Sequence, residues 1–449
     1  MHIQKVYHYS MQGLMKIGIK NIGAIKDVTA ECNGLTVITG KNGSGKSTFA
    51  KAYSAIIDGF RNSTDFFDRN FVVYVQNAII KALKVKSLSE LRYLDRDLYL
   101  SLKRSPRTIK DIFKYISEIK GRLQDFLLEQ DKLVNDASNG NASLRGRTDN
   151  IQKCLVLLDS LRAEYSSDDY RDKHLKRCIR DELNAVFLGQ VAPLERTNSN
   201  STIAIESRGF GFEYDYSADE MWVTDLSSHF PNRAYYIENA SVLDRLDDER
   251  GGIRNLAPRD EFVTARLDDY LFDDFLRRDS GLFGLRAEEQ YKDILDLINQ
   301  AYPYDIVRMN TQVITSNAGV RISNEASGRK IFALLKQMVL SGRLDDSTVI
   351  LFDEPENHLH PEWQLLFAKV MKKIVEQTGA KVFCITHSPT LLFAFDTFFK
   401  ANRDLLRVYY CHREDNGCLF ENVSADISKA HKVLSHPFIQ LDLLGEGAI

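Results

Sequence analysis

The sequence has little of several features that define whole classes of protein. Its six cysteines form no C-x-x-C pair and are too sparse in 449 residues for a disulfide scaffold. No run of about 18 apolar residues occurs. The first fourteen residues lack the apolar core and cleavage site of a signal peptide, and they are either an upstream start or an added tail. These absences predict a cytoplasmic protein that crosses no membrane.

An excess of charge of one sign is also lacking, because 59 basic residues stand against 62 acidic ones and leave a net charge of -3. Such a balance selects neither a nucleic acid nor a membrane as partner of the whole chain. Between residues 81 and 190, however, 22 Lys and Arg stand against 17 Asp and Glu. This local excess fits an arm that binds nucleic acid or a partner, or helix faces that are merely solvated, and we favour the second interpretation.

Hydrophobic periodicity divides the chain into three parts. Residues 1–80 carry short β-branched runs and then helical spacing, which should stop at Gly59. Residues 81–200 have long helical patterning with an Asn-, Ser- and Gly-rich break, which predicts a hairpin-like helical insertion. Residues 201–449 return to strands. The fold expected is α/β, with a mixed sheet and a flanking antiparallel lobe.

The strands of this fold are expected at definite places. The last part should form an antiparallel lobe, then a strand, a helix and a strand of a parallel sheet, then a closing hairpin. The strands expected are 16–19, 24–30 and 35–39, then 201–205, 212–216, 221–224 and 233–237 in the lobe, then 344–354 and 381–386 around a helix over 363–377, and finally 406–411 and 418–423.

One motif carries a clear chemistry. Residues 40–47 read Gly-Lys-Asn-Gly-Ser-Gly-Lys-Ser, the G-x-x-x-x-G-K-S pattern of a phosphate-binding loop between a strand and a helix. The glycines let successive N–H groups point at phosphate oxygens, Lys46 brings a positive charge to the β and γ phosphates, and Ser47 offers a hydroxyl to Mg²⁺. The residues predicted to contact ATP here are Gly40, Lys41, Asn42, Gly43, Ser44, Gly45, Lys46, Ser47 and Thr48.

Two carboxylates follow an apolar strand far downstream. Asp353 and Glu354 come directly after the run Ser-Thr-Val-Ile-Leu-Phe. A strand that ends in this way can place one carboxylate on a metal and the other beside an attacking water. We therefore predict that Asp353 joins Ser47 on Mg²⁺ and that Glu354 is the general base or the water-orienting residue for hydrolysis of the γ-phosphate.

Two further segments narrow the class of nucleotide-binding protein. Ser327 and Gly328 precede an apolar helix and place a hydroxyl and a glycine at its start, which favours an anion site. This segment resembles the signature of ABC-type ATPases, although it lacks the transporter form Leu-Ser-Gly-Gly-Gln. Residues 353–361 resemble the Walker B and D-loop run of OLD-like, RecF-like and SMC-like proteins, and His387 resembles the switch histidine of that family.

The resemblance implies an ABC-type head that uses ATP and Mg²⁺. It implies that His387 senses the γ-phosphate, and that Ser327 and Gly328 reach the nucleotide of an opposing subunit, so that the chain forms a head-to-head homo-oligomer. The family also has a glutamine that joins the metal shell. Gln76 and the Glu238–Asn239 pair compete for that role, and the sequence leaves both open.

Metal sites of another kind are less well supported. His358 and His360 form an H-x-H pair, but no third ligand has suitable spacing, so we favour the D-loop interpretation. The segment with Cys411, His412 and Cys418 could suggest zinc, although such a hairpin is more often ordinary packing.

Three cellular roles fit these motifs. The first is the ATPase subunit of a bacterial anti-phage system that resembles the PARIS or Septu type and controls a separate effector nuclease. The Glu-Asn-His-Leu-His-Pro run favours this role, and the helical insertion is too short for a long SMC arm. The 62 residues after His387 are too few for an appended nuclease domain. The second is a RecF- or SMC-like DNA-binding repair ATPase, and the third, disfavoured by the signature, is a transporter motor.

Overall fold

The computed structural model describes residues 14–65, 69–103, 109–136, 142–166, 168–194, 199–207, 210–224, 233–238, 243, 281–309, 313–316, 320–414 and 417–445. The chain divides into two compact units. One comprises the residues up to Asp58 together with those from Arg180 onward, and the other comprises Gly59–Ile179. The question whether residues 1–14 are a native start therefore falls almost entirely outside the described part of the chain.

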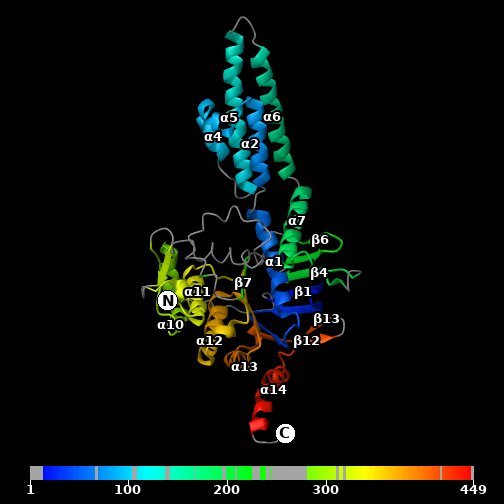
Figure 1. Ribbon diagram of the computed structural model, residues 1–449, viewed down its shortest axis with the longest axis vertical. Helices are drawn as coiled ribbons and strands as arrows, with labels where there is room; N and C mark the ends of the chain where they lie inside the picture. The colour runs from blue at the N-terminus through cyan, green and yellow to red at the C-terminus, as the bar shows by residue number, and fades with distance from the viewer. Residues whose placement is uncertain are drawn as a thin grey trace, which may run out of the picture. The chain divides into compact units, whose positions relative to one another are not determined.

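The first unit is built on one mixed sheet of 11 strands in the order β6-β5-β4-β1-β2-β13-β12-β3-β11-β10-β7 (Figure 1). This arrangement confirms the predicted α/β class with a mixed sheet. The strands are β1 (Met15–Ile22), β2 (Ile25–Cys32), β3 (Leu35–Gly40), β4 (Thr202–Ser207), β5 (Phe210–Asp215), β6 (Glu220–Val223), β7 (Arg233–Ile237), β10 (Thr348–Asp353), β11 (Lys381–Thr386), β12 (Leu406–Glu414) and β13 (Gly417–Asn422).

Helices cover both faces of the parallel part of this sheet, which explains why β3, β10 and β11 are buried along their whole lengths. On one face, Phe49 of α1 (Lys46–Asp65) packs against Phe383 of β11, with ring centroids 5.5 Å apart. The other face carries the main hydrophobic core of the unit. The helices that contribute to that core are α9 (Gly281–Gln290), α10 (Lys292–Ile298), α11 (Ser327–Leu340), α12 (Pro361–Thr378), α13 (Pro389–Phe398) and, through Ala430, α14 (Ser428–Gly445).

The antiparallel lobe consists of β6, β5, β4, β1 and β2, and β13 joins it to the parallel part. Residues 233–237 were expected in this lobe, and that prediction is wrong. They form β7, which pairs in parallel with β10 at the opposite edge of the sheet. Four of the five residues of β7 are buried, as in a strand that belongs to a parallel core, and local sequence pattern does not reveal which strand is the neighbour.

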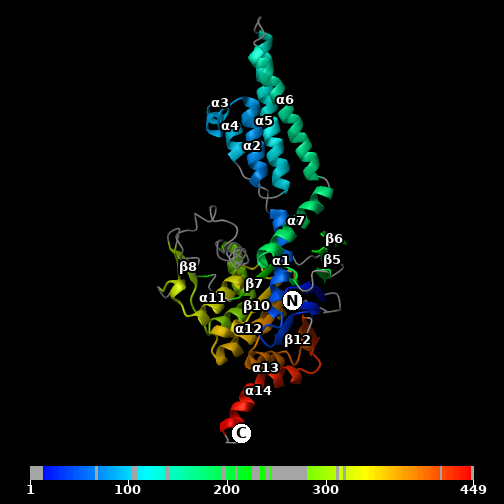
Figure 2. The ribbon, with the colours of Figure 1, turned by 45° about the vertical axis from the view of Figure 1, so that its right-hand side comes forward.

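The second unit is helical. It contains the end of α1 (Lys46–Asp65) and most of α7 (Asp168–Val186), together with α2 (Arg69–Leu83), α3 (Leu88–Leu94), α4 (Arg96–Lys103), α5 (Ile109–Asp136) and α6 (Ala142–Ser166). The long helices α5 and α6 lie side by side in both views (Figures 1 and 2). Apolar side chains at helical spacing, such as Ile116, Ile119 and Leu123 of α5, form the core of this unit.

Gly59 does not end the first helix, contrary to expectation, because α1 continues to Asp65. A Cβ atom at Gly59 would lie 2.7 Å from the Cα atom of Ile179 in α7. The glycine therefore serves the close contact of two helices, and its low helix propensity is overridden.

Contacts along the chain divide it at 59 and 179, whereas sequence pattern divided it at 81 and 200. Helix α2 already contributes Val75, Ile79 and Leu83 to the helical core. At the other end, the Gly23 N–H donates to the Val191 carbonyl at 2.8 Å, which ties the segment after α7 to the turn between β1 and β2.

Three short 3₁₀ helices, one separate hairpin and a terminal helix complete the described chain. They are η6 (Ile322–Asn324), η7 (Pro355–His358), η8 (Arg403–Leu405), the hairpin of β8 (Ile306–Met309) and β9 (Val313–Ser316), and α14 (Ser428–Gly445). None of the described helices combines the length and the apolar character that a membrane span needs.

Candidate functional site

The carboxyl ends of four neighbouring parallel strands meet at one edge of the sheet. Thr39 of β3 pairs with Thr386 of β11, and Ile385 of β11 pairs with Asp353 of β10. On the other side of β10, Phe352 pairs with Ile237 of β7. Because parallel strands end at the same edge, the phosphate-binding loop, the two carboxylates and His387 all leave the sheet side by side.

The loop after β3 has the backbone geometry that its glycines predict. Gly43 and Gly45 have φ values of +71° and +80°, which few other residues adopt. At Gly40, a Cβ atom would lie 2.2 Å from the Cys411 carbonyl oxygen. Helix α1 begins at Lys46, so its N-terminal dipole lies at the end of the loop. Lys41, Asn42 and Gly43 are exposed, Ser44 is buried, and Ser47 and Thr48 are partly exposed.

Lys46 is almost completely buried within this loop. Its ammonium donates hydrogen bonds to the carbonyl oxygens of Gly40 at 3.2 Å and Lys41 at 2.9 Å. Burial lowers the pKa of Lys46, while the nearby carboxylates of Glu354 and Asp353 oppose that shift. The Lys46 ammonium therefore lies against the backbone of the phosphate-binding loop and near the carboxylates of Glu354 and Asp353.

Asp353, the last residue of β10, has the surroundings of a metal ligand. It is 4% exposed, and its Oδ2 atom accepts a hydrogen bond of 2.6 Å from the hydroxyl of Tyr236 in β7. Its Oδ1 atom is buried and has no hydrogen-bond partner among the described residues. A buried carboxylate oxygen without a donor suits a cation, and Mg²⁺ is typically held by one or two protein ligands together with phosphate oxygens and water. The residues present therefore fit Mg²⁺.

Glu354 and His387 form a pair beside Asp353. Glu354 has a left-handed backbone with φ of +53°, a strain of about 1–3 kcal/mol that such sites tolerate. Its Oε1 atom lies 3.1 Å from His387 Nε2, and its Oε2 atom accepts a hydrogen bond from Asn357 at 3.0 Å. The left-handed turn thus fixes the direction in which the Glu354 carboxylate leaves the strand.

The imidazole of His387 favours its neutral form. Burial and the charge of Lys46 lower the pKa of His387, and the carboxylates of Glu354 and Asp353 act in the opposite direction. Because a carboxylate can only accept, the proton of the neutral ring is assigned to Nε2, which then donates to Glu354.

The two positions that compete for the metal-shell glutamine lie in different units. Gln76 is in α2, where its side-chain amide donates to the Leu102 carbonyl at 2.9 Å within the helical unit. Glu238 directly follows β7, and its carboxylate lies 4.0 Å from Lys51 Nζ of α1. Glu238 thus lies at the strand-end edge of its own unit, and Asn239 lies outside the described residues.

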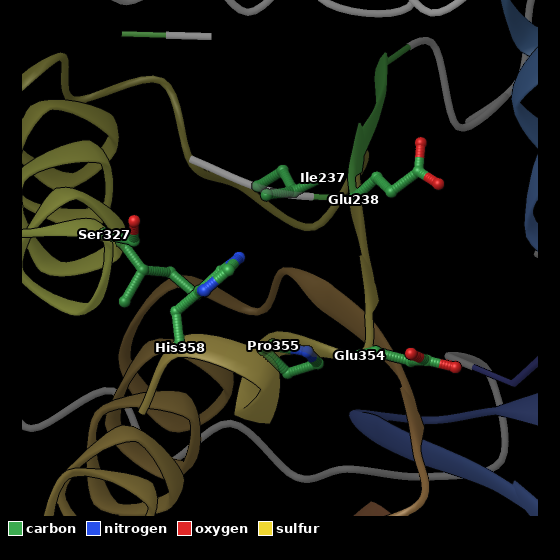
Figure 3. A pocket seen from close by; sticks show the side chains of 7 residues that line it. Ile237, Glu238, Ser327, Glu354, Pro355 and His358 are labelled. Atoms are coloured by element: carbon green, nitrogen blue, oxygen red, sulfur yellow. The ribbon is translucent and has the colours of Figure 1, made fainter. Parts of the chain in front are cut away.

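Ser327 lies on the far side of a small pocket from Glu354. The pocket is lined by Ile237, Glu238, Ser327, Ile331, Glu354, Pro355 and His358. Figure 3 shows that the Glu354 carboxylate points away from Ser327, which projects from the start of α11. Ser327 is exposed, and with His358, His360 and Trp363 it also lines a shallow groove. Within one chain, Ser327 is therefore separated from the Glu354 carboxylate.

Gly328 is buried beneath this groove. A Cβ atom there would lie 2.5 Å from the carbonyl oxygen of His358 in η7 and 3.1 Å from the ring of Trp363. The absence of a side chain therefore lets the first turn of α11 contact the backbone of η7.

The alternative metal sites gain no support from the geometry. Within the described part of the chain, no three His, Cys, Asp or Glu side chains gather to hold a metal ion. All six cysteines are free thiols. Cys411 and Cys418 are buried in the β12–β13 hairpin, and the Cys418 thiol lies 3.5 Å from the Gly43 carbonyl oxygen, under the phosphate-binding loop.

Sequence reasoning missed two residues of this site, Tyr236 and Glu356. Tyr236 orients Asp353 from the neighbouring strand, a contact that no local pattern reveals. Glu356 stands inside the Asp-Glu-Pro-Glu run that drew attention to Asp353 and Glu354. Its position in that motif was the available signal, but its partners at 386–388 become visible only in the fold.

Part of the chain is similar to a known protein family. Residues 195–392 match the family described as "AAA domain, putative AbiEii toxin, Type IV TA system". The chain has no significant match among functionally curated proteins. The matched span includes Ser327, Asp353, Glu354 and His387.

Several solved structures of SMC heads overlap weakly with the chain. The SMC head domain from Thermotoga maritima shares 11% identity, covers 91% of this chain and 98% of its own, and has a TM-score of 0.37. The Smc head of Pyrococcus furiosus with an extended coiled coil, bound to the C-terminal domain of ScpA, shares 12% identity over 94% and 98%, with a TM-score of 0.33. An SmcHead bound to the C-winged helix domain of ScpA shares 11% identity over 93% and 99%, with a TM-score of 0.41.

The candidate site combines residues from inside and outside the matched span. The phosphate-binding loop precedes the matched span, and the sheet brings it next to Asp353, Glu354 and His387 from within that span. Residues 195–392 are thus similar to an AAA domain family, and the phosphate-binding loop lies beside them in the same sheet.

Proposed function

We propose that this chain binds ATP with Mg²⁺ at the strand-end edge and hydrolyses the nucleotide to ADP and phosphate. The observation that carries this proposal is the contact of 3.1 Å between Glu354 Oε1 and His387 Nε2 beside the buried ammonium of Lys46. Glu354 as base, His387 as its hydrogen-bond partner and the phosphate-binding ammonium of Lys46 thus lie together at the strand-end edge of the sheet.

Each residue has a definite task in this proposal. The loop N–H groups and Lys46 bind the phosphates, while Asp353 Oδ1 and the Ser47 hydroxyl hold Mg²⁺. The ion, when bound, supplies positive charge against the β and γ phosphates. Glu354 orients the attacking water and accepts its proton, and His387 donates from Nε2 to the Glu354 carboxylate and holds it in place.

Two substitutions test the activity. Lys46→Ala should abolish ATP binding, because it removes the charge that the loop holds. Glu354→Gln should keep ATP binding and reduce turnover on the order of 100-fold or more, because an amide cannot accept the proton. Lys372→Ala and Glu376→Gln change the same residue types in an i,i+4 pair on α12 and serve as matched controls. Normal turnover in both site variants would refute the proposal.

The proposal extends to a head-to-head pair of chains. Ser327 is exposed at the start of α11, and Glu354 points away from it across the shared pocket. A helix N-terminus with an exposed hydroxyl suits phosphate, which supports the proposal that Ser327 and Gly328 complete the nucleotide site of a second copy. ATP should then shift the chain from monomer to dimer, most clearly in the Glu354→Gln variant, which light scattering would detect.

For the cellular role, we propose a switch in anti-phage defence that controls a separate effector nuclease. The Glu-Asn-His-Leu-His-Pro run supports this role. The description of the family that residues 195–392 match also names a toxin of a toxin–antitoxin system. Cells that carry this gene together with the gene of the proposed effector nuclease should resist phage. Lys46→Ala should remove the resistance. Equal infection of cells with and without the gene pair would contradict this role.

A second candidate is a DNA-binding repair ATPase, favoured by the basic excess between residues 81 and 190. Counterion release predicts that such binding weakens steeply as salt rises, with a slope that reports the number of phosphates contacted. Duplex DNA that binds with this salt dependence and stimulates ATP turnover would favour this role over defence.

A further inference from the structure

Glu356 is a buried acidic residue to which the proposed hydrolysis assigns no task. It lies in η7, three residues after Asp353, and one oxygen of its carboxylate accepts three hydrogen bonds. Its Oε1 atom accepts from the Thr386 hydroxyl at 2.7 Å, from the His387 N–H at 2.6 Å and from the Ser388 N–H at 3.1 Å. One side chain thus fixes the backbone on both sides of the His387 imidazole.

The charge state of Glu356 reflects two opposing influences. Burial raises the pKa of this carboxyl group, and the hydrogen bond from Thr386 and those from the backbone N–H groups lower it. Only an oxygen with free lone pairs can accept several donors at once, so a carboxylate or an amide oxygen suits this position and an alkyl side chain does not.

Two further contacts join the same two segments. The N–H of Glu354 donates to the Ile385 carbonyl at 2.9 Å. The Ser388 hydroxyl donates to Gln364 Oε1 at 2.6 Å, and the side-chain amide of Gln364 donates to the Leu359 carbonyl at 3.1 Å. Residues 354–364 and 385–388 are therefore fixed to each other at three places.

The same 3₁₀ helix borders the surface proposed to meet a second copy. His358 of η7 lines the groove with Ser327, and the His358 carbonyl oxygen would lie 2.5 Å from a Cβ atom at Gly328. Four residues of η7 thus both contact the start of α11 and hold the His387 backbone.

We propose that Glu356 is a positioning residue that fixes the His387 backbone, so that the imidazole meets Glu354, and that it links this geometry to the copy-facing surface of η7. The inference rests on the proposed ATP hydrolysis and deepens it. Glu356 acts in this role through its Oε1 atom, which is occupied by backbone and hydroxyl donors, while its Oε2 atom is buried and accepts no hydrogen bond from the described residues.

The test compares Glu356→Ala and Glu356→Gln with the control Glu376→Gln in the full chain. Glu356→Ala should lower kcat roughly 10- to 100-fold through misplacement of His387, with the Kd for ATP changed less than about threefold. Glu356→Gln keeps an acceptor oxygen for the same donors and should recover most of kcat. Amide hydrogen exchange of residues 386–391 in the nucleotide-free chain should accelerate in Glu356→Ala alone, because the His387 N–H loses its acceptor and the Ser388 N–H keeps only the Thr386 hydroxyl.

Unchanged exchange at 386–391 in Glu356→Ala would overturn the positioning role, whether or not the chain hydrolyses ATP. An unchanged kcat, or equal losses in Glu356→Ala and Glu356→Gln, would overturn it as well, while leaving the proposed function intact if Glu354→Gln still blocks turnover. A loss of ATP binding parallel to the loss of kcat would indicate general damage and would also count against the role.

Discussion

Two glycines in helices of the helical unit should respond oppositely to the same substitution. Alanine is favoured over glycine inside a helix by about 0.8–1 kcal/mol. At Gly121 in α5, a Cβ atom would meet nothing within 4 Å, so Gly121→Ala should stabilise this unit by that amount. At Gly59 in α1, the Cβ atom would lie 2.7 Å from the Cα and 2.8 Å from the Cγ1 of Ile179. Such a contact forces the helices apart and costs about 1–3 kcal/mol.

The propensity gain is common to both variants, so their difference isolates the contact with Ile179. The Gly59→Ala variant should be less stable than the Gly121→Ala variant by about 1–3 kcal/mol. Because the propensity gain offsets only about 0.8–1 kcal/mol of that cost, Gly59→Ala should also be less stable than the parent chain unless the cost lies at the low end of its range. Urea denaturation followed by circular dichroism measures both changes as shifts in midpoint at constant slope. Equal stabilisation by the two substitutions would refute the close contact of α1 with α7 and the continuation of α1 through Gly59.

Further predictions concern the site. Gly328→Ala should weaken ATP-dependent pairing in light scattering and leave the Kd of one chain for ATP within about threefold, because its Cβ atom would displace the backbone of His358. Tyr236→Phe removes the donor to Asp353 and should raise the Mg²⁺ concentration for half-maximal turnover about tenfold. The lowered pKa of His387 means that the folded chain binds fewer protons than the unfolded chain as the pH falls below 6.5. The free energy of unfolding should therefore decrease on that acid side, and His387→Gln should lose part of this dependence.

Local pattern was sufficient for most strands and for the phosphate-binding loop. The runs 233–237 and 381–386 form strands over the predicted residues. They could be predicted because a short run of mostly apolar residues is a signal that lies within the segment itself. The neighbour of a strand is not a local property, and so the position of β7 beside β10 was missed. The expected helix stop at Gly59 failed for a related reason, since a contact with Ile179, 120 positions along the chain, outweighs propensity there.

The site shows the same division between local and distant information. The sequence motifs indicated Lys46, Asp353, Glu354 and His387. Each is a residue type with a definite chemistry that stands at or shortly after the end of a predicted strand. The supporting contacts come from partners distant in sequence. Tyr236 reaches Asp353 across two paired strands, and Glu356 reaches the backbone beside His387.

A mixing experiment tests the composite nucleotide site most directly. Lys46→Ala disables the phosphate-binding loop of its own chain, and Ser327→Arg should disable the site of the opposite chain, so each pure sample should be inactive. In an equal mixture, half of the pairs are mixed and each has one intact site, so about one quarter of the parent turnover should return. Turnover of this size would support the account. A mixture as inactive as its components, or full activity of Ser327→Arg alone, would contradict it.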